Sequence, residues 1–249
     1  GFNVAGPSAR DLLSRLSNED LSNENFRFMR SRQMTVGGLD AKVLRVSFTG
    51  DLGYELWMKN ADGLALWDRL WDAARDWGLK AIGFEALNLA RIEAGFIAAQ
   101  VDFQPIHSTL RLGRGRTPLE LGFERLVDFE KGHFNGRRAL LQQRQEGLRT
   151  HLVKIELGGF KPSNGALLYH RKTKEVGHVT SGAWSPTTKR NIALAELKAP
   201  YGGQVQDDLW AEIYVHEEGQ WARRLVPVTV QTSPFFSHPR ARATPPRPF

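Results

Sequence analysis

The feature that most constrains the fold is a series of short alternating segments in the second half of the chain. From His151 to Val230, six runs of alternating apolar and polar residues are separated by Gly, Pro and Asn. Such alternation is typical of strands buried on one face, and turn residues at short spacing join them. The runs are HLVKIEL, GALLYH, EVGHVTSG, NIALAELK, DLWAEIYV and RRLVPVTV. They predict a small β-barrel or sandwich.

The first part of the chain combines helical and strand-like patterns. After the Gly6-Pro7 turn, apolar residues at helical spacing predict a short helix with Ser8 as its N-cap. Further patterns predict strands at residues 44–48 and 54–58 and helices at residues 61–77 and 83–94. Together they predict an α+β unit with helices on one face of an antiparallel sheet.

The predicted domain organisation follows from this change of pattern. A short helix at residues 136–146 connects the two parts. We therefore expect a first domain at residues 1–147 and a C-terminal β-barrel at residues 148–239. The last residues, RARATPPRPF, are rich in Pro and Arg and predict a disordered tail at residues 240–249.

Composition excludes several classes of protein. The 249 residues contain no cysteine, which rules out disulfides, thiolate nucleophiles and Cys-ligated metal or iron–sulfur centres. The seven histidines lack metal-ligand spacing, so we expect no metal site. The net charge of +7 is spread along the chain and indicates a basic surface rather than nucleic-acid binding. No run approaches the roughly 20 apolar residues of a membrane helix, and we expect a cytoplasmic protein without membrane contact.

The segment FTGDLGYEL, residues 48–56, is the most informative motif. It packs two glycines and two acids into a strand–turn–strand element. Glycine lets a backbone approach a flat ligand, and a carboxylate can accept two N–H bonds from an amino-pyrimidinone ring such as pterin. The alternative is a glycine-kinked hairpin with solvated acids, and this segment alone does not decide between them.

Seven motifs in one order carry a resemblance to the glycine-cleavage T-protein (aminomethyltransferase) superfamily. They are AGPSARDLLSRL, FTGDLGYE, GFEALNLARIEAG, TPLELGF, KGHFNGRRAL, GHVTSGAWSPTTKRNIALA and PFFSHP. Each motif alone is weak, but the ordered set spans nearly the whole chain. The resemblance implies the folate-binding α+β fold of that superfamily, in part, followed by its C-terminal barrel.

The resemblance also implies a tetrahydrofolate site. Glu55 matches the carboxylate that holds the pterin ring, and Phe48 stands where the family commonly has a tyrosine near the folate. Arg240 lies in the closing segment and could meet the carboxylates of the cofactor. Asp51 replaces the commoner glutamate, and we expect it to order the turn.

The function implied is transfer of an aminomethyl or methyl group from a small methylated amine or related donor to tetrahydrofolate. A carrier protein or a flavin domain is a further implied partner. The family's catalytic aspartate lies upstream of the Gly-Pro entry, so we expect a chain truncated at its N-terminus, assign no catalytic residue and expect this fragment to be inactive. The methyl donor and the oligomeric state do not follow from the sequence.

Two alternatives remain open. The first is a folate-dependent O- or S-demethylase, which Leu87 favours because glycine-cleavage members often carry arginine at this position. In the same helix motif, Arg91 and Glu93 indicate a structural ion pair. The second is a folate-binding accessory protein for iron–sulfur assembly without methyltransferase activity. Those proteins carry a K-G-C-Y-x-G-Q-E element, where this chain has KGHFNGRRAL and no cysteine.

Overall fold

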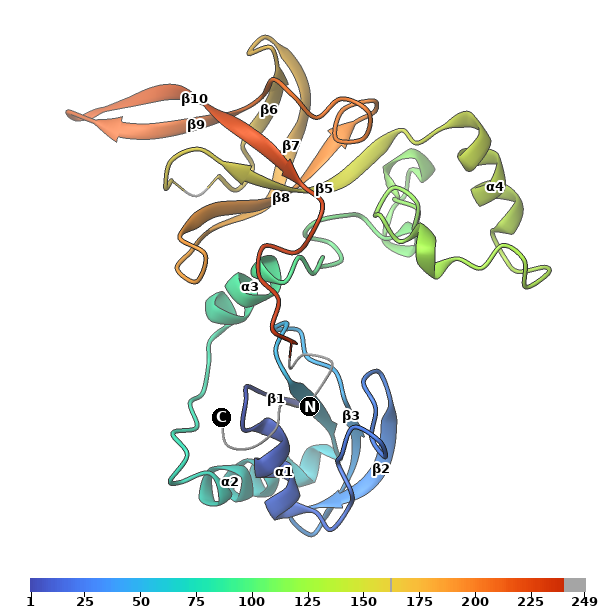
Figure 1. Ribbon diagram of the computed structural model, residues 1–249, viewed down its shortest axis with the longest axis vertical. Helices are drawn as coiled ribbons and strands as arrows, with labels where there is room; N and C mark the ends of the chain where they lie inside the picture. Colours follow the sequence, from blue (N-terminus) through green and yellow to red (C-terminus); the bar gives the residue numbers. More distant parts are fainter. Residues whose placement is uncertain (162, 240–249) are drawn as a thin grey trace. The chain divides into compact units, whose positions relative to one another are not determined.

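The computed structural model describes residues 1–161 and 163–239. By its internal contacts the chain divides into unit 1, Gly1–Ala94 with the described residues from Ser237 on, and unit 2, Gly95–Phe236 (Figure 1). This division differs from the boundary predicted at residues 147 and 148, which rests on sequence pattern and stays a prediction. The predicted tail, residues 240–249, lies outside the described residues.

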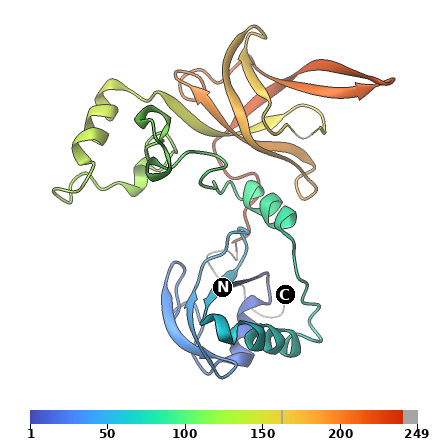
Figure 2. The same cartoon turned by 180° about the vertical axis from the view of Figure 1, so that it is seen from behind.

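Unit 1 is built on a four-stranded antiparallel sheet in the order β1-β4-β3-β2. The strands are β1 (Phe2–Ala5), β2 (Ser31–Val36), β3 (Leu39–Leu44) and β4 (Gly53–Trp57), and the helices are α1 (Ala9–Leu16), α2 (Gly63–Ala73) and α3 (Phe84–Glu93), with a 3-10 turn at Asn60–Asp62. Figure 2 shows α1 and α2 packed on the same side of the sheet. The predicted class, helices on one face of an antiparallel sheet, is confirmed for this unit.

The core of unit 1 follows from the alternation of its strands. Tyr54 and Leu56 of β4 are fully buried and form one cluster with leucines of α1 and α2. Residues on a strand alternate between its faces, so Gly53, Glu55 and Trp57 lie on the opposite face. That second face of β4 is the one that does not pack on the core cluster with α1 and α2.

Unit 2 contains a closed six-stranded barrel in the order β10-β5-β8-β7-β6-β9. Its strands are β5 (Thr150–Leu157), β6 (Leu167–His170), β7 (Lys174–Ser185), β8 (Arg190–Lys198), β9 (Leu209–Glu217) and β10 (Gln220–Gln231). The predicted barrel is confirmed. Ahead of it lie α4 (Arg137–Glu146) and 3-10 turns at Ile106–Ser108, Leu112–Arg114 and Glu124–Leu126.

Several local predictions need correction. Ser8 makes no side-chain cap, and its carbonyl instead accepts the amide of Leu12 at 3.0 Å. The predicted strand at residues 44–48 is wrong because β3 ends at Leu44, and residues 17–40, expected to be turn-rich, contain β2 and the first two residues of β3. Helix α2 ends at Ala73 rather than near Trp77.

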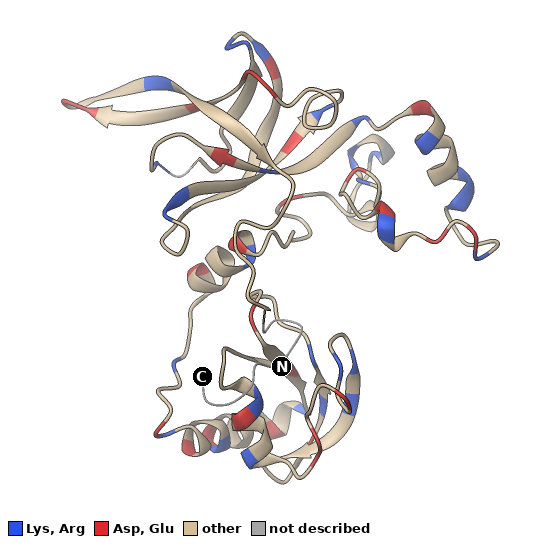
Figure 3. Ribbon diagram, in the orientation of Figure 1, with Lys and Arg blue, Asp and Glu red and all other residues tan. Residues whose placement is uncertain are grey.

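The charged residues are distributed over both units (Figure 3). Lys and Arg occur on strands and loops of both units and on α4 of unit 2, rather than in one segment (Figure 3). Within the described residues, no helix is long and apolar enough to cross a membrane.

Candidate functional site

The candidate site centres on β4 and the loop of residues 45–52 that precedes it. This loop is held by its own hydroxyl groups. The hydroxyls of Ser47 and Thr49 lie 2.7 Å apart, and each accepts a backbone N–H: Ser47 from Thr49 and Thr49 from Asp51. Such side-chain bonds to nearby backbone are typical of turns formed by Ser and Thr. The loop therefore holds a defined shape next to β4.

Glu55 lies on the face of β4 that the helices do not cover. Its neighbours across the sheet are Asn3 of β1 and Leu44 of β3. One carboxylate oxygen, Oε2, accepts the indole N–H of Trp57 at 3.1 Å, and the described residues show no other hydrogen bond or ion pair for Glu55. Its other oxygen is thus available to accept hydrogen bonds from a ligand.

Phe48 and Asp51 come from the same loop but differ in setting. Phe48 is 37% exposed, so its ring is partly open to solvent. Asp51 uses Oδ1 to accept the amide of Leu52 at 2.6 Å, and its Oδ2 lies 3.7 Å from Nε2 of His238. These contacts are those of a turn-forming residue, which is the role predicted for Asp51.

Gly50 of the loop and Gly53, the first residue of β4, pack against protein rather than facing open space. A Cβ on Gly53 would lie 2.5 Å from Cβ of Ser47, and one on Gly50 would lie 2.5 Å from Cβ of Ala94. Gly50 also has a φ of +76°, a backbone conformation that favours glycine. These glycines let the chain pack on Ser47 and on the end of α3. That they also let the backbone approach a flat ligand stays a prediction.

His238 is a contact that sequence reasoning missed at this loop. It belongs to the PFFSHP motif, and its approach to Asp51 brings the closing segment of the chain to the FTGDLGYE loop. The sequence signal for this contact was that PFFSHP and FTGDLGYE belong to the same ordered set of motifs. Arg240, the predicted residue of this segment, lies outside the described residues.

The helix motif of α3 has a structural and a pocket-facing side. Arg91 is 2% exposed and donates from Nε to Asn88 at 2.9 Å, and Glu93 is 9% exposed. Leu87 lines an apolar pocket of about 320 Å³ beside β1 and α2. Phe2, Trp67, Trp71 and Phe84 also line this pocket. At this volume it falls at the lower end of the range of small-molecule pockets, about 300 to 1,000 Å³.

Asp102 of unit 2 is a buried anchor that the sequence did not reveal. It is 2% exposed, and its Oδ1 accepts the hydroxyls of Thr180 and Ser181, each at 2.6 Å. Its Oδ2 accepts the amide of Ala98 at 2.8 Å. Because protein donors engage both oxygens, Asp102 fastens residues 98–102 to β7.

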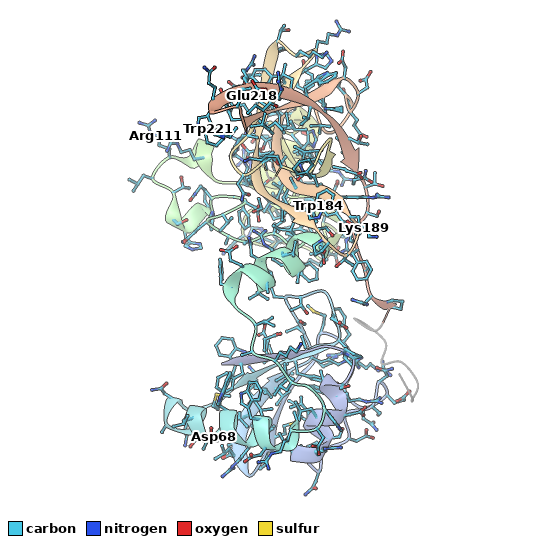
Figure 4. All side chains as sticks on the ribbon, turned by 90° about the vertical axis from the view of Figure 1, so that its left-hand side faces the viewer. Asp68, Arg111, Trp184, Lys189, Glu218 and Trp221 are labelled. Atoms are coloured by element: carbon cyan, nitrogen blue, oxygen red, sulfur yellow. The ribbon has the colours of Figure 1, made fainter. Side chains whose placement is uncertain are left out.

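Thr180 and Ser181, the hydroxyl residues of the VTSG motif, thus donate hydrogen bonds to Asp102. The same strand also carries His178, which is exposed, and Trp184, which is 39% exposed and lies near Lys189 at the β7–β8 hairpin (Figure 4). The described residues contain no group of three or more His, Cys, Asp or Glu side chains that could hold a metal ion.

The fold and the motif order define a class: an antiparallel sheet with helices on one face, followed by a closed six-stranded barrel. Two family models match the chain, the GCVT N-terminal domain over residues 1–131 and the glycine cleavage T-protein C-terminal barrel domain over residues 151–237. The chain therefore belongs to the glycine cleavage T-protein family.

Named relatives agree with this assignment. An aminomethyltransferase of Caldanaerobacter subterraneus subsp. tengcongensis is 34% identical over 206 residues, which cover 82% of this chain and 52% of the relative. Human mitochondrial dimethylglycine dehydrogenase is 32% identical over 217 residues, which cover 85% of this chain and 24% of that protein. The chain spans about half the length of the aminomethyltransferases that it matches.

A solved structure shares the fold. The aminomethyltransferase T of the Bartonella henselae glycine cleavage system matches with a TM-score of 0.71 and 22% sequence identity, over 94% of this chain and 57% of that one. At this identity the likeness concerns the fold alone.

Proposed function

We propose that this chain forms the folate-holding part of a tetrahydrofolate-dependent aminomethyl- or methyltransferase. The observation that carries the proposal is Glu55, a carboxylate on the uncovered face of β4 with one oxygen free of partners among the described residues. Family membership and the names of the relatives support the reaction class.

The residues present fit such a ligand. The free Oε1 of Glu55 can accept N–H groups from the edge of a pterin ring, and the partly exposed ring of Phe48 offers an aromatic face. Phe48 has no hydroxyl, so its contribution is contact alone. When bound, tetrahydrofolate supplies the nitrogen that accepts the one-carbon unit, and the protein contributes binding and orientation.

A folate-dependent O- or S-demethylase is the alternative that Leu87 favours within this class. Leu87 lines the apolar pocket, so this position presents a hydrophobic side chain and no charged donor. The match to human dimethylglycine dehydrogenase supports a methylated amine as donor and a flavin domain as a partner. A carrier protein and a cytoplasmic location also stay proposals.

The decisive experiment is titration of tetrahydrofolate into the Glu55→Gln variant by calorimetry. Gln presents an N–H₂ where an acceptor is needed, so two charge-assisted bonds are lost at a cost of about 2 to 4 kcal/mol. Affinity should fall by well over tenfold while the melting temperature stays nearly unchanged.

Asp51→Asn is the matched control, since it removes one charge from the same loop and should leave affinity almost intact. The titrations use this chain and a longer form that begins with the first half of an aminomethyltransferase relative. If Glu55→Gln binds tetrahydrofolate as tightly as the parent in both forms, the pterin is held elsewhere and the proposed site is wrong.

A further inference from the structure

Lys154 is a half-buried lysine that the proposed function leaves unused. It lies in β5, where Val153 and Ile155 belong to the barrel core. Because neighbours on a strand point to opposite faces, Lys154 lies on the outer side of the barrel wall. Across the sheet it is paired with Leu194 of β8 and Gln231 of β10, neither of which carries a charge.

The acids on the same outer face are already engaged. Glu156, two residues along β5, pairs with Arg190 at 3.2 Å. Glu196 of β8 binds Arg116 through two contacts of 2.5 and 2.6 Å. Lys154 has no ion pair among the described residues. Its ammonium form therefore lacks a compensating negative charge.

The stem of Lys154 is fixed by close packing on Gly95. A Cβ built on Gly95 would lie 2.9 Å from Cδ of Lys154 and 3.8 Å from its Cε, and Cα of Pro234 is 3.8 Å from the same Cβ position. Gly95 has a φ of +71°, so both its backbone and the space above it favour glycine. The lysine stem occupies the space that a side chain at residue 95 would fill.

This setting favours the neutral amine. Burial lowers the pKa of Lys154 below the ordinary lysine value, since a charged group without a partner is costly to desolvate. A deprotonated amine is the nucleophilic form, as in lysines that form Schiff bases. Within the described part of the chain, Glu156 and Glu196 on this face are each paired with an arginine. The buried Asp102, which meets the Leu194 carbonyl through Thr180, accepts hydrogen bonds from Thr180, Ser181 and Ala98 and forms no ion pair with Lys154.

We propose that Lys154 is a reactive amine that condenses with small aldehydes. The nitrogen lone pair adds to the carbonyl carbon, the oxygen takes up a proton and the nitrogen loses one, giving a carbinolamine. Loss of water then gives an imine, so that one amine and one aldehyde yield one imine and one water. The capture requires no folate and stands independently of the proposed function.

The chain has ten lysines, and the other nine are internal controls. The purified chain is treated briefly with limiting formaldehyde and cyanoborohydride over a range of pH, and methylation at each lysine is measured by mass spectrometry. Lys154 should be labelled first at pH 7, and its labelling should reach half of its maximum at a lower pH than the exposed Lys42, Lys59 and Lys189. The same labelling of a proteolytic digest, in which the fold is lost, measures how far the neighbouring residues alone change the reactivity of each lysine.

Two variants test the structural basis. Gly95→Ala displaces the lysine stem, so the midpoint of Lys154 labelling should shift up toward that of the exposed lysines. Lys154→Met keeps the apolar stem and should abolish the fast labelling at pH 7 without lowering the melting temperature. If either variant fails to fold, the pH profile of the parent chain still decides. Labelling of Lys154 at pH 7 that is no faster than that of the exposed lysines overturns the proposal.

Discussion

Gly53 shows why a residue without a side chain is needed at the start of β4. Its Cβ position lies 2.5 Å from Cβ of Ser47, 2.9 Å from Oγ of Ser47 and 3.1 Å from the carbonyl oxygen of Val4. Two of these contacts are too close for any real Cβ, and the third involves backbone that cannot move easily. The glycine therefore lets the 45–52 loop fold back on the sheet and so sets the position of Glu55.

Gly53→Ala should destabilise unit 1 by about 1 to 3 kcal/mol, the usual cost of inserting an extra methyl group into a packed site. The matched control is Gly63→Ala at the first residue of α2, where nothing lies within 4 Å of the Cβ position. That control should be neutral or stabilising by up to about 1 kcal/mol, because alanine favours helix over glycine. Urea unfolding measures both, and equal midpoints for the two variants would contradict this account of Gly53.

At the residue scale, the face on which Glu55 lies follows from the sequence, whereas two long-range contacts do not. In YELW, Tyr54 and Leu56 are buried and Glu55 lies on the opposite face, which is the period-2 alternation of a strand and can be read from the sequence. The packing of Gly50 on Ala94 and the approach of His238 to Asp51 join residues far apart in the chain. Such contacts have no local pattern, so no single-sequence argument finds them.

Among the elements, β2 and β3 were the hardest to predict. Their inward residues Met34, Val36, Ala41 and Val43 are buried, but Lys, Asp, Thr and Gln between them gave a polar, turn-rich composition. At Arg45 the error was the reverse: residues 45–48 of the segment LRVSF were predicted as strand but lie outside β3. Arg45 is 1% exposed and donates to the carbonyl of Phe26 at 2.7 Å, in a connection outside the β2–β3 ladder. Tertiary bonds of a buried arginine override the local preference for strand.

Asp102→Asn tests the link between the 98–102 segment and β7. The amide cannot offer acceptors to the hydroxyls of Thr180 and Ser181 and to the amide of Ala98 at once, so one buried donor loses its partner. We expect unit 2 to lose about 1 to 3 kcal/mol and the Ala98 amide to exchange hydrogen faster.

The control for this change is Asp207→Asn, which alters the same charge at an exposed residue whose side chain has no hydrogen bond or ion pair among the described residues. Unfolding in urea and hydrogen exchange are measured on both variants. Identical unfolding midpoints and exchange rates would mean that the buried carboxylate does not hold the segment.

At the scale of the whole molecule, Glu212 and His151 contribute to the response to acid in two different pH ranges. The pKa of Glu212 is lowered to about 2, chiefly by its hydrogen bond to Arg223 and also by one to Tyr214. A carboxyl whose folded pKa is depressed stabilises the fold above its ordinary value of 4.5, and that contribution is lost as the pH falls toward 2. This contact therefore plays no part in any change near neutral pH.

His151 of β5 acts in a higher pH window. Its ring lies against Gly203, where a Cβ would be 2.7 Å from Nε2, and burial lowers its pKa below the ordinary 6.5, although the charge of Glu120 partly opposes the shift. The unfolded chain then binds the proton more readily than the folded chain, so stability is greatest above pH 6.5 and falls as the pH drops through the folded pKa. Melting curves between pH 7.5 and pH 5 should show unit 2 losing stability, and His151→Gln should remove that part of the loss. His178→Gln, at an exposed residue of β7, is the matched control for the substitution. If the parent and His151→Gln lose stability in parallel over this range, protonation of His151 is not what makes the barrel sensitive to mild acid.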